Sequence, residues 1–351
     1  LNAALNIPSP HDSTQPKYKA RHMVRFYERE GVHIFPRDSF RSFRSMVHDF
    51  NNRTLNFDRL DSLLKHGHYE HASLGRSLRA LYGRSKFSDS LRSLIIPVYN
   101  LAAHTRSTSA EQERHFPNLG GGAVWFKNLK TPHLLKTTLA PDVDMYDAVM
   151  ASTAAPTYFP CHHFPTQWTP HQAETTITGI DGSVFDNPCI SYMGALRPHL
   201  PPDRDLIMIV LGTGHSNRAI EKEQWNRYGS LGVVDPSNDM PLINIFFYAS
   251  ETALLDSFED EMQGRLYVFN KSLISGPYMN DFPSTNIDDA SPENLRRLKN
   301  FFEMTLEENR KPFDDMCQLL VRNFDSKKTD PVDDNTPPTL KQRLRNTILG
   351  K

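Results

Sequence analysis

A single apolar run constrains the fold more than any other part of the chain. Residues 205–214 read DLIMIVLGTG, in which six consecutive apolar residues are followed by a turn that contains Gly212 and Gly214. Such an uninterrupted run is typical of a strand that is covered on both faces, as strands of parallel sheets are. The sequence therefore predicts a central buried strand that ends in a tight turn.

Strand and helix patterns alternate along the rest of the chain. Apolar, β-branched or aromatic runs predict further strands, and longer amphipathic segments predict helices. This alternation predicts an α/β fold with a mostly parallel sheet. Residues 1–324 are expected to form one domain, and the Pro-, Asp- and Thr-rich residues 325–351 a polar linker with a short final helix. Strands are expected at residues 94–101, 122–128 and 265–270, and helices at 144–156, 241–263 and 291–324.

The composition is that of an ordinary globular protein and argues against nucleic-acid binding and against a transmembrane helix. The 351 residues are 38% hydrophobic and 23% charged, with a formal net charge of −1. Because there is no dense block of Lys and Arg, we expect no binding to nucleic acid. No apolar run approaches the ~18 residues of a transmembrane helix, and no basic-then-apolar leader occurs in these residues. We therefore expect a soluble, cytosolic protein that meets membranes only at their surface.

The chain has three cysteines, Cys161, Cys189 and Cys317. Their odd number and wide spacing argue against a disulfide scaffold. This pattern favours a reducing compartment. The sequence predicts no particular protein partner.

One carboxylate lies where a catalytic group could be placed. The β-branched run TITGI ends at Asp181, which is followed by Gly182 and Ser183, and Pro188 opens an expected helix. Asp-Gly pairs are common in turns, so Asp181 could simply cap a turn or a helix. Alternatively, it could be a general base held at the end of a strand, beside a glycine that allows close packing.

Several stretches, in this order, resemble the patatin-like phospholipase family. The most specific are ASTAAPTYFP and, after it, DGSVFDNP, which contains the Asp-Gly pair described above. The similarity extends from Leu1 to about Phe324, and residues 325–351 lie outside it. The stretches that carry it are residues 26–37, 84–101, 148–160, 181–188, 209–214 and 286–298.

The resemblance implies a lipid acyl hydrolase of the phospholipase A type on a three-layer α/β/α fold with a mostly parallel central sheet. Its substrate would be a phospholipid or glycerolipid, and no metal or cofactor would be needed. In the family a serine attacks the ester and an aspartate acts as base; Asp181 matches that aspartate. Gly182 and Ser183 complete an Asp-Gly-Ser motif where Asp-Gly-Gly or Asp-Gly-Ala is usual. Asn187 and Pro188 match the end of the motif.

The nucleophile of the family has no counterpart in the chain. No G-x-S-x-G elbow occurs among the 351 residues. The opening LNAALNI is similar to the helix that follows the elbow, so the resemblance implies that the serine, the oxyanion loop and the first strand precede Leu1. The alternative is a catalytically inactive fragment, or a lipid-binding or interaction module on the same fold. A third hypothesis is an acyltransferase, which would pass the acyl group to an alcohol.

Histidines offer weaker candidates. His66, His68 and His71 lie in KHGHYEH with a spacing that could bind a transition metal. The family resemblance treats this stretch as an ordinary helix, so we expect no metal site. His162 and His163 are interpreted as surface or cleft-rim residues rather than as general acids. The glycines at 120–122 are interpreted as a flexible loop, not as an oxyanion loop.

Overall fold

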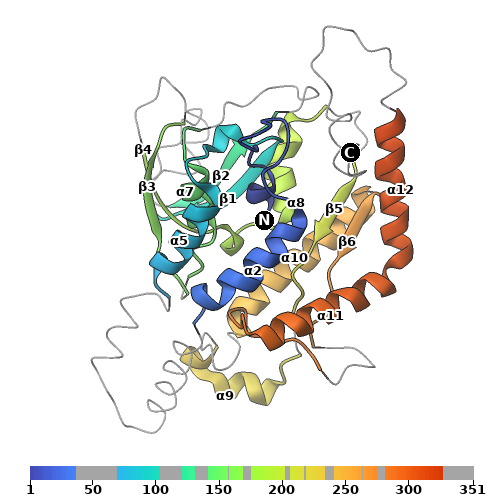
Figure 1. Cartoon of the computed structure of the whole chain (residues 1–351). Helices are drawn as coiled ribbons and strands as arrows, with labels where there is room; N and C mark the ends of the chain where they lie inside the picture. The colour runs from blue at the N-terminus through green and yellow to red at the C-terminus, as the bar shows by residue number, and fades with distance from the viewer. Residues whose placement is uncertain are drawn as a thin grey trace, which may run out of the picture.

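A computed structural model describes most of the chain (Figure 1). The described residues are 1–36, 69–102, 121–130, 141–156, 158–168, 175–201, 206–216, 219–233, 241–262, 264–274 and 281–326. The helices are α1 (Asn2–Leu5), α2 (Ala20–Ile34), α5 (His71–Tyr82), α7 (Met145–Ser152), α8 (Pro188–Ser191), α9 (Lys222–Gly232), α10 (Pro241–Met262), α11 (Pro292–Glu308) and α12 (Arg310–Ser326). The strands are β1 (Leu94–Asn100), β2 (Gly122–Asn128), β3 (His162–Thr166), β4 (Thr175–Asp181), β5 (Met208–Leu211) and β6 (Leu266–Phe269). Short turns of helix are η1 (Phe87–Asp89), η2 (Gly182–Val184), η3 (Tyr192–Leu196) and η4 (Arg197–His199).

The larger sheet has four strands in the order β2-β1-β4-β3. Its three strand pairs are all antiparallel, so the prediction of a mostly parallel sheet is wrong for these strands. The cause is clearest between β3 and β4. Only eight residues, 167–174, connect them, whereas a parallel pair needs a crossover of about a dozen residues or more. The α/β class itself is confirmed.

The apolar run that dominates the sequence forms β5, which pairs with β6 in parallel. The prediction of a central buried strand is wrong. Val210 is buried on α10's side, but Leu211 is 70% exposed and Ile209 37% exposed. Within the described residues these two strands form a sheet of their own; Met208 and Leu266 pack with Phe258 of α10, and Phe269 contacts Phe313 of α12.

Helix α7 packs against the four-stranded sheet and forms the main hydrophobic core with it. Its small residues Ala148 and Ala151 are fully buried, which lets the helix approach β4 closely. At Gly179 in β4, a Cβ atom would lie 2.6 Å from the Cβ of Ala151, so the strand accepts no side chain there. On the opposite side, Trp125 of β2 packs against Gly194 of η3.

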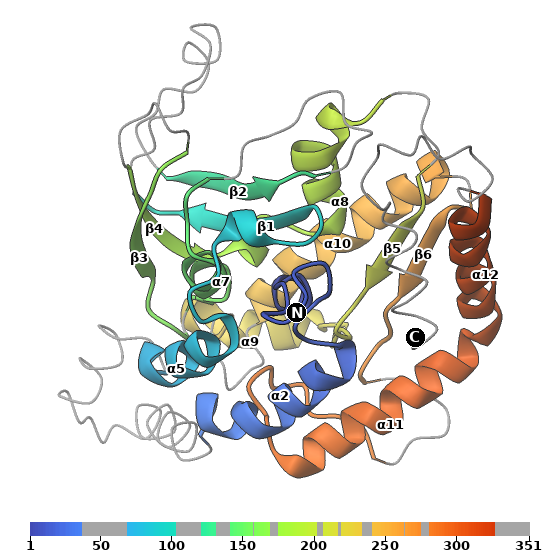
Figure 2. The same ribbon diagram turned by 45° about the horizontal axis from the view of Figure 1, so that its top comes forward.

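Helices α8 and α10 lie between the two sheets. Figures 1 and 2 both show this arrangement, with α5 and α7 beside the four-stranded sheet and α11 and α12 at the far side of the molecule. Cys189 of α8 and Phe258 of α10 belong to one buried cluster that joins these helices. The segment after β4, which carries the candidate motif, is thereby held between the four-stranded sheet and α10.

The first and last parts of the described chain are tied together by polar contacts. The Tyr69 hydroxyl donates a 2.6 Å hydrogen bond to Asp288 in a buried setting. The Tyr69 ring also packs among Phe35, Tyr158 and Phe159. The hydrogen bond thus joins two segments that are 219 residues apart in the sequence.

None of the helices in the described residues combines the length and apolar character needed to cross a membrane. Helix α12 ends at Ser326, and the rest of the predicted linker lies outside the described residues.

Candidate active site

Asp181 is the last residue of β4 and the cap of the short helix η2. It pairs with Val98 of β1, and its N–H donates a 3.0 Å hydrogen bond to the Ala154 carbonyl. Its carboxylate accepts a 2.8 Å hydrogen bond from the Ser183 N–H. The capping interpretation of Asp181 is therefore confirmed, and the same cap holds the carboxylate in a fixed direction at the end of the strand.

The surroundings of Asp181 favour its neutral form. Burial raises the pKa of the Asp181 carboxyl, and hydrogen bonds from the backbone and side chain of Ser183 lower it by less. A carboxylate whose pKa is raised by desolvation is a better proton acceptor near neutral pH than an exposed one. Asp181 thus has the electrostatic character of a general base.

Gly182 packs directly against the backbone of β1. A Cβ atom at this position would lie 2.4 Å from the Pro97 carbonyl oxygen, and the residue is buried. The prediction that this glycine permits close packing is confirmed. The contact matters because it holds the carboxylate of the preceding residue against the sheet.

The Gly182→Ala variant should therefore be less stable than the wild-type chain by about 1–3 kcal/mol, since the obstructing atom belongs to backbone that cannot rotate away. Urea unfolding of both proteins measures this difference. Gly122→Ala is the matched control, because a Cβ atom there meets nothing within 4 Å. Equal stability of the two variants would contradict the packing argument.

Asn187 and Pro188 start helix α8, as the sequence predicts. The Asn187 side-chain oxygen accepts 3.0 Å hydrogen bonds from the N–H groups of Cys189 and Ile190, and Pro188 occupies the first turn, where no donor is needed. The amide nitrogen of Asn187 is buried and has no hydrogen-bond partner among the described residues. It is a donor that remains free for a ligand.

Asp186 lies directly before Asn187 and accepts two side-chain hydrogen bonds. One of its oxygens accepts from the Trp125 indole at 3.3 Å, and the other accepts from the Ser191 hydroxyl at 2.7 Å. An asparagine has only one acceptor oxygen, whereas a carboxylate can accept from both donors. Burial raises the pKa of Asp186, and these hydrogen bonds lower it by less.

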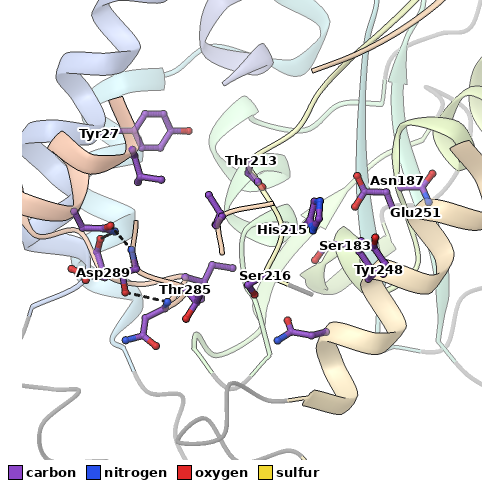
Figure 3. A pocket seen from close by; sticks show the side chains of 18 of the residues that line it. Tyr27, Ser183, Asn187, Thr213, His215, Ser216, Tyr248, Glu251, Thr285 and Asp289 are labelled. Carbon is purple, nitrogen blue, oxygen red and sulfur yellow. Dashed lines mark hydrogen bonds between the residues drawn. The ribbon is translucent and has the colours of Figure 1, made fainter. Parts of the chain in front are cut away.

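A cavity of 670 Å³ lies next to the motif. Ser183, Asp186 and Asn187 line it, but Asp181 does not. In the view of Figure 3, Ser183 and Asn187 are drawn on the same side as His215, Tyr248 and Glu251. Other elements complete its wall: Tyr27, Thr213, Gly214, Ser216, Asn244, Leu273, Ser284, Thr285, Asn286, Ile287, Asp289, Asn294 and Leu298.

Sequence reasoning missed His215 and Glu251 as wall residues. Asn270 links the turn before His215 to Glu251. Its side-chain oxygen accepts a 2.9 Å hydrogen bond from the Gly214 N–H, and its side-chain nitrogen donates to Glu251 at 3.1 Å. The turn is close-fitting, since a Cβ atom on Gly212 would lie 2.2 Å from the Asn270 side chain, and Gly214 has a φ of +84°. In the sequence, Gly212 and Gly214 after β5 were the features that could have indicated this turn as part of a site.

The other histidine candidates lie away from the cavity. His162 is held by a 2.8 Å hydrogen bond to Asp147, and His163 is exposed and contacts Thr178 at 2.9 Å. Neither lines the cavity wall. His66 and His68 lie outside the described residues, as does Gly120, while His71 begins α5.

The comparison with known families agrees with the motif. Residues 27–193 match the patatin-like phospholipase family, and the match includes Asp181, Gly182, Ser183, Asn187 and Pro188. Residues 27–193 are thus similar to a patatin-like phospholipase domain.

A curated relative shows the same similarity. Patatin-like protein 2 of Arabidopsis thaliana is 25% identical over 260 residues, which cover 70% of this chain and 55% of the relative. The chain thus spans about half the length of that patatin-like relative. His215 and Glu251 lie beyond the end of the family match at residue 193.

Proposed function

We propose that this patatin-like domain hydrolyses acyl esters of phospholipids or glycerolipids as a serine-dependent hydrolase of the phospholipase A type. Asp181 would be the general base of a Ser-Asp dyad. The observation that carries the proposal is the half-buried carboxylate at the end of β4, held by its hydrogen bond to the Ser183 N–H and with a pKa raised by desolvation, inside the region that matches the family. Ser183, two residues on, extends from that carboxylate to the wall of the cavity.

The proposed chemistry divides the hydrolysis into two steps. Asp181 takes the proton of a serine hydroxyl while the serine oxygen attacks the ester carbonyl, and the alcohol leaves with a proton from the aspartic acid. Water then attacks the acyl-serine and gives a proton to Asp181, which passes it to the departing serine oxygen, so the fatty acid and the starting enzyme are released. The serine and the oxyanion donors would come from a segment that is not among these 351 residues. The segment would have to end in a G-x-S-x-G elbow before Leu1.

A second candidate function is supported by the absence of a G-x-S-x-G elbow from the 351 residues. In that case the domain would bind lipid or a partner without cleaving esters. Reading the coding sequence upstream of Leu1 distinguishes the two. An in-frame elbow supports the hydrolase, and a start codon directly before Leu1 supports the binding module. Product analysis with an added alcohol would separate a hydrolase from an acyltransferase.

We also propose that contact with membranes is peripheral and uses apolar side chains. Ile287, on the cavity wall, is 77% exposed, and Phe246 of α10 is 64% exposed. The formal net charge of −1 gives no excess of positive charge for anionic lipids.

Co-sedimentation of the chain with phosphatidylcholine liposomes should therefore change little between low and moderate salt, because apolar burial is not screened by ions. Ile287→Ser should reduce the bound fraction. Leu320→Ser on α12, which changes another exposed apolar residue, is the control and should not reduce it. A steep loss of binding with salt would show that the contact is electrostatic instead.

A further inference from the structure

The cavity wall carries negative but no fixed positive charge. Its titratable carboxylates are Asp186, Glu251 and Asp289, and no Lys or Arg belongs to the wall as far as the described residues define it. The hydrogen bonds to these carboxylates come from neutral groups: the Asn270 amide to Glu251, and the Ser291 N–H to Asp289. Asp186 accepts from the Trp125 indole and the Ser191 hydroxyl, as described above.

Cations near the cavity are bound to other carboxylates. Lys271, which follows Asn270, forms an ion pair with Glu308. Arg297, which precedes the wall residue Leu298, forms ion pairs with Asp281 and Glu293. These pairs compensate the positive charges of Lys271 and Arg297, and neither residue lines the cavity.

Two ring or amide nitrogens in the wall lack a partner. The Asn187 amide nitrogen and His215 Nδ1 are both buried without a hydrogen bond among the described residues. They come from distant parts of the sequence, yet Figure 3 draws them on the same side of the cavity, with Glu251 and Tyr248. The His215 ring lies 5.2 Å from the Tyr248 ring. Buried polar atoms without partners are costly, and a ligand with polar groups would satisfy them.

We propose that this cavity binds the head group of the acyl lipid and selects head groups that offer a hydroxyl group or an ammonium cation and carry no net negative charge. The inference rests on the proposed function, because it takes the ligand to be an acyl lipid. Its volume of 670 Å³ lies within the range of pockets that enclose small molecules.

The chemistry of the wall supports this selection in two ways. Carboxylates accept hydrogen bonds from hydroxyl or ammonium groups, and the Tyr248 ring can face a quaternary ammonium. Sites for anionic phosphate groups normally supply Arg or Lys, which the described wall lacks. A net negative head group would also be repelled by Glu251 and Asp289 in a partly desolvated space.

The test measures binding rather than turnover, on the chain of residues 1–351. Isothermal titration compares three short-chain lipids below their micelle concentrations: dihexanoyl phosphatidylcholine, dihexanoylglycerol and dihexanoyl phosphatidylglycerol. We expect the anionic phosphatidylglycerol to bind at least about tenfold more weakly than the better of the other two. Glu251→Gln should reduce that ratio at least about threefold, since it keeps the shape and the Asn270 contact but removes the charge.

Asp256→Asn is the matched control. It removes a carboxylate from the same helix at an exposed position outside the cavity wall, so the ratio should not change. If Glu251→Gln does not fold, Asn244→Lys places a cation in the wall and should increase the relative affinity for phosphatidylglycerol. That second variant keeps the proposal testable.

Each outcome decides the proposal. Tighter binding of phosphatidylcholine assigns the site to an ammonium group, and tighter binding of dihexanoylglycerol assigns it to hydroxyl groups. Equal or tighter binding of phosphatidylglycerol, an unchanged ratio in both wall variants, or no binding of any of the three lipids overturns it. Failure of the Ser-Asp dyad would appear only in turnover, so the two failures are distinguishable.

Discussion

Residues 1–351 expressed alone are expected to hydrolyse no phospholipid ester above the uncatalysed rate and to take up no fluorophosphonate probe. The chain contains no G-x-S-x-G elbow, so Asp181 has no elbow serine to deprotonate. Losing one oxyanion donor costs about 10²–10³ in rate in a well-studied serine hydrolase, and here the nucleophile would be absent as well. Turnover on phospholipid vesicles and probe labelling measure the two activities.

The outcome that would contradict this expectation involves Ser183. Its side chain is hydrogen bonded to the Asp181 carboxylate, and the residue lines the cavity. If the isolated chain is labelled and Ser183→Ala abolishes the label, Ser183 is the nucleophile and the proposal of a serine before Leu1 is wrong. Ser257→Ala, at an exposed position on α10, is the control and should leave any label in place.

In a form of the protein that includes the proposed elbow, Asp181→Asn should reduce ester hydrolysis by about 10²–10⁴-fold. The substitution removes the base, but its side-chain oxygen can still accept the hydrogen bond from the Ser183 N–H. The variant should therefore unfold at nearly the wild-type temperature. Turnover of a short-chain p-nitrophenyl ester and a thermal unfolding curve measure the two effects separately.

The pH profile of the wild-type protein adds an independent readout for the same residue. Because burial raises the pKa of Asp181, the acidic limb of kcat/KM should lie at higher pH than an exposed aspartate would give. Activity then rises with pH as the carboxyl loses its proton. Asp256→Asn should retain both the turnover and the profile. Near wild-type turnover in Asp181→Asn would refute the assignment of the base.

The motif from Asp181 to Pro188 was predictable because local rules govern it. A carboxylate at a strand end, a glycine facing backbone and a proline in the first turn of a helix are each set by neighbours a few residues away. Their positions in the structure agree with the sequence prediction. Their catalytic roles remain predictions, since no described contact tests them.

The direction of the sheet and the far wall of the cavity were not predictable from the sequence. An apolar run such as β5 indicates a buried strand, but whether a second layer covers it depends on distant segments, and Leu211 is left exposed. Likewise, His215 and Glu251 line one cavity, and the Asn270 side chain joins the turn after β5 to α10 there. No spacing of residues in the sequence predicts a contact among the turn after β5, Asn270 and α10.

The hydrogen bond between Tyr69 and Asp288 has a consequence for biosynthesis. Its acceptor follows its donor by 219 residues, and ribosomes add about 5–20 residues per second. The Tyr69 hydroxyl therefore waits about 11–44 s for its partner after its own synthesis. Contacts of such long sequence separation also slow folding itself, because a long loop must close before they form. Tyr69 thus completes its native contacts only after a segment that follows it by 219 residues has been translated.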